Sequence, residues 1–115
     1  MAVLAPLIQI EQPGPRSSVA VLLGEHDMST CHEVRDVLET LMQRNDLVVA
    51  DISQTEFIDS TIIAVLLEAA EAARGRDVKF RLQLGTTAAV EAAVQLSGIL
   101  EVIECESNRE AALRD

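Results

Sequence analysis

The chain has 115 residues, of which 49% are hydrophobic, and a formal net charge of −10 at pH 7. This length and apolar content suit one domain, residues 1–115, with a single core. A strongly negative protein repels nucleic acid phosphates and anionic lipid headgroups, and a chain without Trp or Tyr lacks the rings that stack best on single-stranded bases. We therefore expect neither nucleic acid nor a membrane as a direct partner.

The cysteine pattern gives no sign of a metal or cofactor site. Cys31 and Cys105 lie far apart, without a Cys-x-x-Cys pair, and the only nearby histidine is His32. We predict two buried free thiols and no metal or cofactor. No stretch reaches the roughly 18 to 20 apolar residues of a membrane span, and the N-terminal residues lack the positive region of a secretory signal, so we expect a cytoplasmic protein.

The first elements read as a hairpin followed by a polar loop. Two aliphatic runs, Leu7–Glu11 and Val19–Leu23, flank a turn that contains Pro13, Gly14 and Pro15. Residues Gly24–Asp27 are polar and predict a loop, so His26 should be exposed there. We expect residues 1–6 and 114–115 to be flexible ends.

A helix and a buried strand follow. Thr30 and Glu33 have the spacing of a capping box, which predicts a helix that runs to about Gln43 and exposes His32. Its apolar stripe consists of Val34, Val37, Leu38 and Leu41. Leu47–Ile52 is continuously apolar, as expected for a central strand covered on both faces.

The helix from Ser60 to Arg74 is the most informative segment. Asp59 is the predicted N-cap, which places the Ser60 hydroxyl at the first helical position, where free backbone N–H groups and the helix dipole favour an anion such as phosphate. One apolar stripe can seal a core, and a second runs beside it through Ile62, Val65, Ala69 and Ala72. Either the helix is buried on both sides, or the second stripe is an exposed surface for a partner.

The remaining elements complete an α/β pattern. Val78–Leu84 alternates as a strand with one drier face, and Thr86 or Thr87 begins a helix that stops at Ser97-Gly98. Ile99–Ile103 reads as a short strand, and the capping-box spacing of Ser107–Glu110 opens a helix through Leu113. We predict a mixed sheet of four to five strands with about four helices packed on it.

Three motifs resemble those of STAS domains, the family of bacterial anti-sigma factor antagonists and of the tails of sulphate transporters. The first is Asp51-Ile52-Ser53 followed by Phe57-Ile58-Asp59-Ser60-Thr61. Leu23–Asp27 is similar to the family's loop after its second strand, and Val94–Leu100 is similar to its Leu-x-x-Ser-Gly-Leu segment. The resemblance spans about residues 7–113, with the three motifs in order.

The resemblance implies a phosphorylation switch. In the antagonists, the unphosphorylated domain binds an anti-sigma factor that is also a serine kinase and so frees the sigma factor. Phosphorylation breaks that complex, and a serine phosphatase restores it. Carried over residue by residue, Ser60 is the expected phosphorylation site, with Asp27 and Asp59 at the acidic positions that flank it. The partner surface is expected to include Thr61, Ile62 and Val65 as well.

The chain departs from the family after the modified serine. The family has Ser-Gly-Leu-Gly there, whereas this chain has Thr61-Ile62-Ile63-Ala64. A glycine permits close approach of a partner backbone. An outward-facing Ile62 would instead enlarge an apolar docking surface or obstruct the kinase.

Two other functions are compatible with these residues. Ser60 with His26 and Asp27 could form a hydrolytic triad, but the chain has no Gly-x-Ser-x-Gly elbow and its glycines never cluster into a phosphate loop, so we expect no enzyme. The stronger alternative is a STAS-like scaffold that docks a protein or senses a small ligand and is never phosphorylated.

Overall fold

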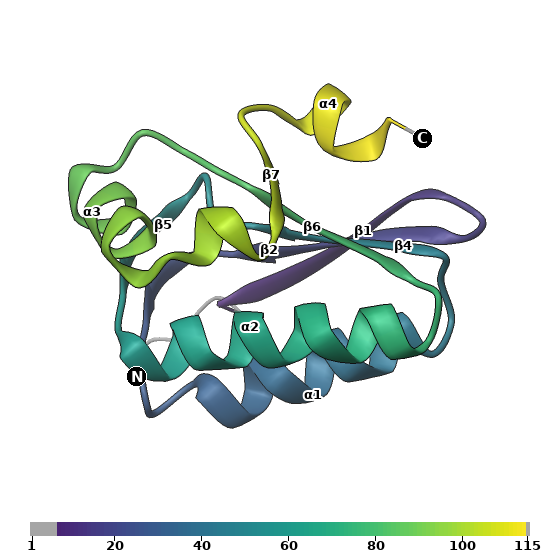
Figure 1. The fold of residues 1–115 in the computed structure, drawn as a ribbon, viewed down its shortest axis with the longest axis horizontal. Helices are drawn as coiled ribbons and strands as arrows, with labels where there is room; N and C mark the ends of the chain where they lie inside the picture. The colour runs from purple at the N-terminus through teal and green to yellow at the C-terminus, as the bar shows by residue number, and fades with distance from the viewer. Residues whose placement is uncertain (1–6, 115) are drawn as a thin grey trace, which may run out of the picture.

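The computed structural model describes residues 7–114 as an α/β structure with a mixed sheet (Figure 1). The expected flexible residues 1–6 and 115 lie outside the described residues. The five-stranded sheet has the order β1-β2-β4-β6-β7, in which β1 and β2 are antiparallel and the other neighbours are parallel. Its strands are β1 (Ile8–Gly14), β2 (Ser17–Leu22), β4 (Leu47–Asp51), β6 (Lys79–Gln83) and β7 (Glu104–Glu106).

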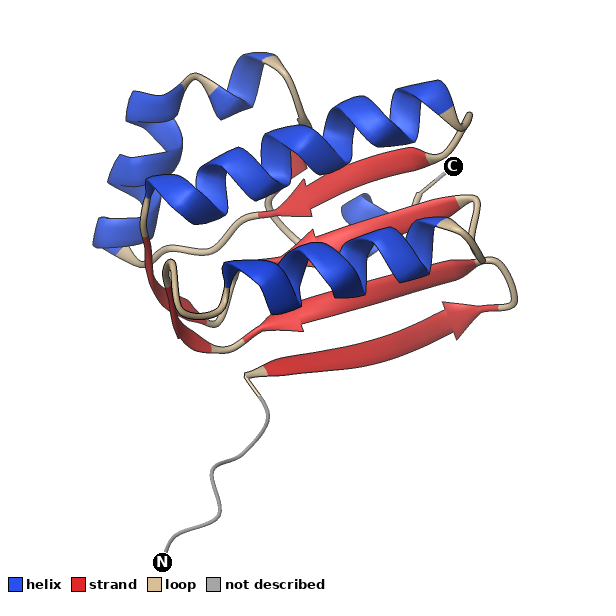
Figure 2. Cartoon of the chain, turned by 90° about the horizontal axis from the view of Figure 1, so that it is seen from below, coloured by secondary structure: helices blue, strands red, loops and turns tan. Residues whose placement is uncertain are grey.

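Helices cover both faces of this sheet. Two long helices, α1 and α2, lie side by side on one face, and a short helix, α4, lies on the other (Figures 1 and 2). A third helix, α3, packs at one end of the molecule against a second, parallel sheet of two strands, β3 and β5. These elements are α1 (Cys31–Met42), β3 (Gly24–His26), β5 (Thr55–Ile58), α2 (Ser60–Gly75), α3 (Ala88–Ser97), the 3-10 turn η1 (Ile99–Glu101) and α4 (Arg109–Leu113).

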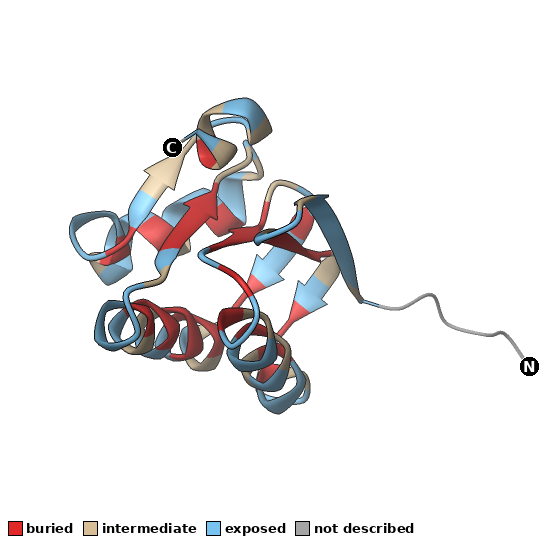
Figure 3. Cartoon of the chain, turned by 90° about the vertical axis from the view of Figure 1, so that its right-hand side faces the viewer, coloured by how far each residue is buried: buried red, intermediate tan, exposed pale blue. Residues whose placement is uncertain are grey.

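The core follows the two-residue alternation of the strands. Ala20, Leu22 and Ala50 face α1 and α2, whereas Val19, Val21 and Val49 face α4 and pack with Ala112. Buried residues therefore line the whole middle of the sheet and the inner sides of the helices (Figure 3). This arrangement confirms that Leu47–Asp51 is a central strand covered on both faces, and that the chain opens with a hairpin.

The second apolar stripe of α2 is buried apart from Ala72, which is half-buried. Ile62 is 0% exposed and Val65 is 2% exposed, because α2 packs against the sheet with one side and against α1 with another. The prediction that Ile62 and Val65 contact a partner is therefore wrong. Of the two interpretations of the second stripe, burial on both sides is the correct one.

The face of β6 that the sequence pattern assigned to solvent is buried except at Lys79. Arg81 and Gln83 are buried, at 5% and 7% exposure. Arg81 Nε donates to Glu104 Oε1 at 2.7 Å and its Nη1 donates to the Ala112 carbonyl at 2.9 Å. Burial is possible because α4 and β7 supply partners for these polar groups.

Three local predictions also differ from the structure. Thr30 begins α1 without a side-chain cap, and Asn108, not Ser107, caps α4 by accepting from the Ala111 N–H at 2.8 Å. Residues Ile99–Glu101 form a 3-10 turn, so the last strand comes later, at Glu104–Glu106. The expected polar loop at Gly24–Asp27 is mostly strand β3, whose residues pair with β5.

Gly85 lies against the backbone of Ser53, where the segments after β4 and β6 run side by side. A Cβ atom at this position would lie 2.6 Å from Ser53 Cα and 2.8 Å from the Ser53 carbonyl oxygen, closer than non-bonded atoms approach. Gly75, at the end of α2, has nothing within 4 Å of the equivalent point.

We expect Gly85→Ala to lower the free energy of unfolding by about 1 to 3 kcal/mol, because backbone must move to admit the methyl group. Gly75→Ala is the matched control and should leave stability unchanged or raise it slightly, since alanine favours the helix. Urea unfolding of both variants measures the difference. Equal stability of the two variants would contradict the close approach of Gly85 to the Ser53 backbone.

Candidate functional site

Ser60 is the first residue of α2, and Asp59 caps the helix before it. Asp59 is extended, with φ −112° and ψ −174°, and its Oδ1 accepts from the N–H groups of Thr61 at 3.0 Å and Ile62 at 3.3 Å. The Thr61 hydroxyl also donates to this carboxylate, and Thr61 is half-buried. Ser60 itself is exposed. The two neighbouring hydroxyls therefore differ: that of Thr61 supports the cap, and that of Ser60 faces solvent.

A loop from the preceding strand pair brings a second carboxylate to this place. The Met28 N–H lies near enough to the Asp59 carboxylate to favour its charge, so the loop that contains Asp27 and Met28 lies beside the cap. Asp27 Oδ1 accepts from the Ser29 hydroxyl at 2.6 Å and the Ser29 N–H at 2.8 Å. The two carboxylates are near enough for the charge on Asp59 to oppose ionisation of Asp27.

Both carboxyl groups are nevertheless held in the ionised form. The Ser29 hydroxyl lowers the pKa of Asp27, and the Thr61 hydroxyl lowers the pKa of Asp59 with help from the N–H groups of the helix and of Met28. The start of α2 therefore carries two negative charges beside Ser60 at neutral pH.

His26 is buried, not exposed as its polar sequence context predicted. Its Nε2 lies 3.1 Å from the Leu23 carbonyl and 3.2 Å from the Leu7 carbonyl, and its Nδ1 lies 3.0 Å from Thr30 Oγ1. Since two carbonyls face Nε2, that nitrogen carries a proton and donates. His26 thus fixes the start of the Asp27 loop, and neither ring nitrogen is directed to Ser60 as a triad would require.

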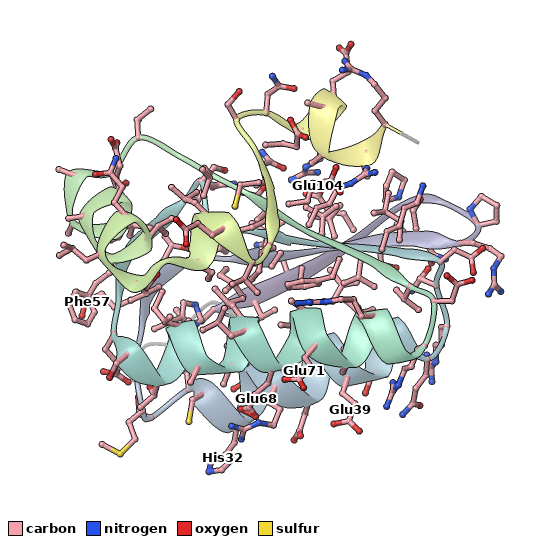
Figure 4. All side chains as sticks on the ribbon, viewed as in Figure 1. His32, Glu39, Phe57, Glu68, Glu71 and Glu104 are labelled. Carbon is pink, nitrogen blue, oxygen red and sulfur yellow. The ribbon has the colours of Figure 1, made fainter. Side chains whose placement is uncertain are left out.

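Exposed apolar side chains surround Ser60. A shallow groove of about 250 Å³ separates the start of α2 from α3, and Ser60, Asp59 and Leu96 all line it. Leu96 is 89% exposed, Met28 is 70% exposed, and Phe57, which projects beside α3 in Figure 4, is 44% exposed. We call this region the Ser60 surface. It consists of Asp27, Met28, Phe57, Asp59, Ser60 and Leu96.

The structure brings together four of the six predicted site residues. Asp27, Asp59, Ser60 and Thr61 lie at one end of α2, while Ile62 and Val65 are in the core. The sequence prediction missed Met28, Phe57 and Leu96. Leu96 could have been found, because it lies off the stripe formed by Val90 and Val94, the two buried residues of α3.

The cysteines lie outside this site. Cys31 is buried at the start of α1, and Cys105 in β7 is half-buried, so the prediction of two buried thiols is correct for the first only. Burial raises the pKa of Cys105 to about 11, with a further contribution from Glu106 and Glu104. A thiol with this pKa is not ionised at neutral pH and is a poor nucleophile.

The family of the chain follows from comparison with known proteins. A family model described as the Mlab, STAS domain matches residues 11–104. The chain belongs to the STAS domain family. No curated protein matches it.

Solved structures share the fold of this STAS domain. The unphosphorylated anti-sigma factor antagonist SpoIIAA has a TM-score of 0.76 at 19% identity, over 90% of this chain and 91% of that one, and the phosphorylated form of Bacillus SpoIIAA has a TM-score of 0.69 at 18% identity over 90% and 95%. A putative antagonist from Thermotoga maritima has a TM-score of 0.81 at 13% identity, over 92% and 91%. The STAS domain of a Vibrio cholerae SulP transporter has a TM-score of 0.66 at 18% identity, over 90% and 81%.

Within residues 7–114, three or more His, Cys, Asp or Glu side chains never come together as a metal site. In the same part of the chain, each helix is too short or too polar to cross a bilayer.

We expect Asp59→Ala to lower the free energy of unfolding by about 0.5 to 2 kcal/mol, because the first turn of α2 loses its cap. The pKa of Asp59 is depressed in the folded protein. The stability that this carboxylate contributes is therefore complete above its unfolded-state pKa of about 4 and is lost as the pH falls through its folded-state pKa. In urea unfolding, the free energy of unfolding of the variant should therefore be lower than that of wild type by a constant amount between pH 6 and 8, on the order of the cap energy. Below about pH 4 this difference should shrink.

The exposed Asp36, on the outer side of α1, provides a control for this measurement. Asp36→Ala should leave stability nearly unchanged, since no cap is lost. An Asp59→Ala variant as stable as Asp36→Ala would show that the carboxylate does not hold the helix start.

Proposed function

We propose that this STAS domain is an anti-sigma factor antagonist that is switched by phosphorylation of Ser60. The unphosphorylated domain binds an anti-sigma factor with serine kinase activity and thereby regulates sigma-factor-dependent transcription. A serine phosphatase reverses the modification, and the domain itself is a cytoplasmic binding module without catalytic activity. The observation that carries the proposal is the exposed Ser60 hydroxyl at the start of α2, next to the Asp59 carboxylate, with the Asp27 carboxylate and exposed apolar side chains nearby.

The position of Ser60 explains how a phosphate can change binding without unfolding the domain. The N-terminus of α2 stabilises an anion, so the phosphate does not strain the fold. It adds about −1.5 to −2 charges, however, on a surface that already carries ionised Asp27 and Asp59. A partner that covers Met28 and Leu96 with apolar groups would have to desolvate this charge, and binding would be lost.

Burial of Ile62 removes an objection to phosphorylation. The family has a glycine two residues after the modified serine, at the position of Ile62. A large side chain that faced outward at this position would obstruct a kinase. Ile62 is 0% exposed, so the side chain lies in the core and leaves the approach to Ser60 open. Docking specificity then depends on the residues around Ser60 and not on this substitution.

The fold alone does not select this function, since the comparison includes the STAS domain of a SulP transporter. The alternative is an unmodified STAS scaffold that docks a protein through the same surface. Support for the switch comes from the pair Asp59-Ser60 and from SpoIIAA, a structural neighbour that has been solved in unphosphorylated and phosphorylated forms.

We expect Ser60→Asp to weaken binding to the anti-sigma factor at least tenfold, whereas Ser60→Ala should bind like wild type. The aspartate adds a charge to the Ser60 surface, and the alanine only removes a hydroxyl. Titration calorimetry against each purified anti-sigma factor kinase of the source organism provides the measurement. Equal binding by Ser60→Asp and Ser60→Ala to the same partner would support the unmodified scaffold.

We expect Leu96→Ser to weaken the same complex by roughly tenfold, because the leucine is 89% exposed in the free domain and is covered in the complex. Val102→Ser is the matched control, since Val102 is 48% exposed and lies outside the Ser60 surface. Neither variant should change the urea unfolding midpoint appreciably. Equal affinities of the two variants would exclude Leu96 from the docking surface.

A further inference from the structure

A second cleft lies on another side of α3. It has a volume of about 240 Å³ and opens at the carboxyl ends of the parallel strands β4 and β6. Its floor is apolar and includes Ile52, Val90 and Val94, which are nearly or fully buried. Gly85 forms part of the wall, where its backbone lies close to that of Ser53. Carboxyl ends of parallel strands are a common position for small-molecule sites.

The mouth of this cleft carries a negative charge. Thr86, Glu91 and Gln95 stand at the mouth, and Glu91 is the only ionisable side chain among the lining residues. Gln95 Nε2 lies 3.4 Å from Glu91 Oε1, which keeps the carboxylate beside the opening. The whole protein has a net charge of −10, so its field also favours a cation over an anion at this place.

We propose that this α3 cleft binds a small amine with an apolar body. An apolar cavity of about 150 Å³ accommodates benzene, so a cleft of this size can hold a phenyl ring with a short chain. The apolar body lies on Ile52, Val90 and Val94, and the ammonium group lies near the Glu91 carboxylate. The proposal does not depend on phosphorylation of Ser60.

The cleft and the Ser60 surface share α3. Val90, Glu91, Val94 and Gln95 line the cleft, whereas Ala93, Leu96 and Ser97 line the groove beside Ser60. Only Val90 and Val94 of this helix are buried, and its N-cap Thr87 makes no side-chain cap hydrogen bond. A ligand that shifts α3 therefore also moves Leu96 relative to Ser60.

The test is an amide NMR titration of the ¹⁵N-labelled full chain at pH 7 with 2-phenylethylamine. We expect a dissociation constant of about 1 mM, as suits so small a ligand, with shifts at Ile52, at Gly85 and along α3. The neutral analogue 2-phenylethanol should bind roughly threefold more weakly and 3-phenylpropanoate more weakly still, because an exposed carboxylate contributes a modest charge interaction.

Two pairs of variants make the test specific. Glu91→Gln should reduce amine affinity to that of the alcohol, whereas Glu71→Gln, on α2 (Figure 4), should not. Gln95→Trp should close the mouth and abolish binding, while Ala92→Trp, at an exposed position of α3 outside the lining, should not. Shifts that map outside the cleft, binding that survives Gln95→Trp, or no preference for the amine over the alcohol and the carboxylate would overturn the proposal.

Discussion

The Asp59 carboxylate is the interaction on which the candidate site depends. It accepts from the Thr61 and Ile62 N–H groups of α2 and from the Thr61 hydroxyl, and the Met28 N–H of the neighbouring loop also favours its charge. Two segments that are far apart in the sequence, the start of α2 and the Met28 loop, thereby meet around one side chain. Ser60 comes directly after Asp59 and is exposed. Its hydroxyl therefore lies at a helix start whose geometry is fixed by Asp59 and Thr61.

On the face of the sheet that α4 covers, charged hydrogen bonds stabilise the packing. Asp51, at the end of the central strand, is 1% exposed and accepts from Arg109 Nη2 at 2.6 Å and from the Ser53 N–H at 2.8 Å. Arg109 also donates from Nε to Gln83 Oε1 at 2.7 Å, and Arg81 donates to the Ala112 carbonyl. A five-residue helix is too short to cover a sheet by apolar contact alone, so α4 is held by these charged hydrogen bonds.

Local patterns in the sequence predicted the four helices, the opening hairpin, the central strand and the position of Ser60. A helix start marked by an N-cap aspartate before an apolar helical repeat can be recognised from a few neighbouring residues. The same holds for the helix end at Gly98, which has a φ of 76° and ends α3 as predicted. The three STAS motifs added the family, which the family model confirms.

The errors arose where a residue's environment comes from distant segments. Ile62 is buried because α1 packs beside α2, and Arg81 is buried because α4 and β7 supply its partners. The His26 ring is enclosed partly by a distant segment, since its Nε2 lies 3.2 Å from the Leu7 carbonyl, while its other hydrogen-bond partners, Leu23 and Thr30, are near in the sequence. Thr30 was therefore unavailable as a helix cap. Such contacts depend on tertiary packing, which periodicity does not encode.

The most direct test of the switch is intact-mass analysis with peptide mapping after incubation with Mg-ATP and extract of the native cells. The substrates are wild type, Ser60→Ala and Thr61→Ala. Our account predicts one phosphate on wild type and on Thr61→Ala, whose lost hydroxyl only supported the cap, and none on Ser60→Ala. Absence of phosphate from all three, in an extract that modifies a control STAS substrate, or a phosphate retained by Ser60→Ala, would contradict it.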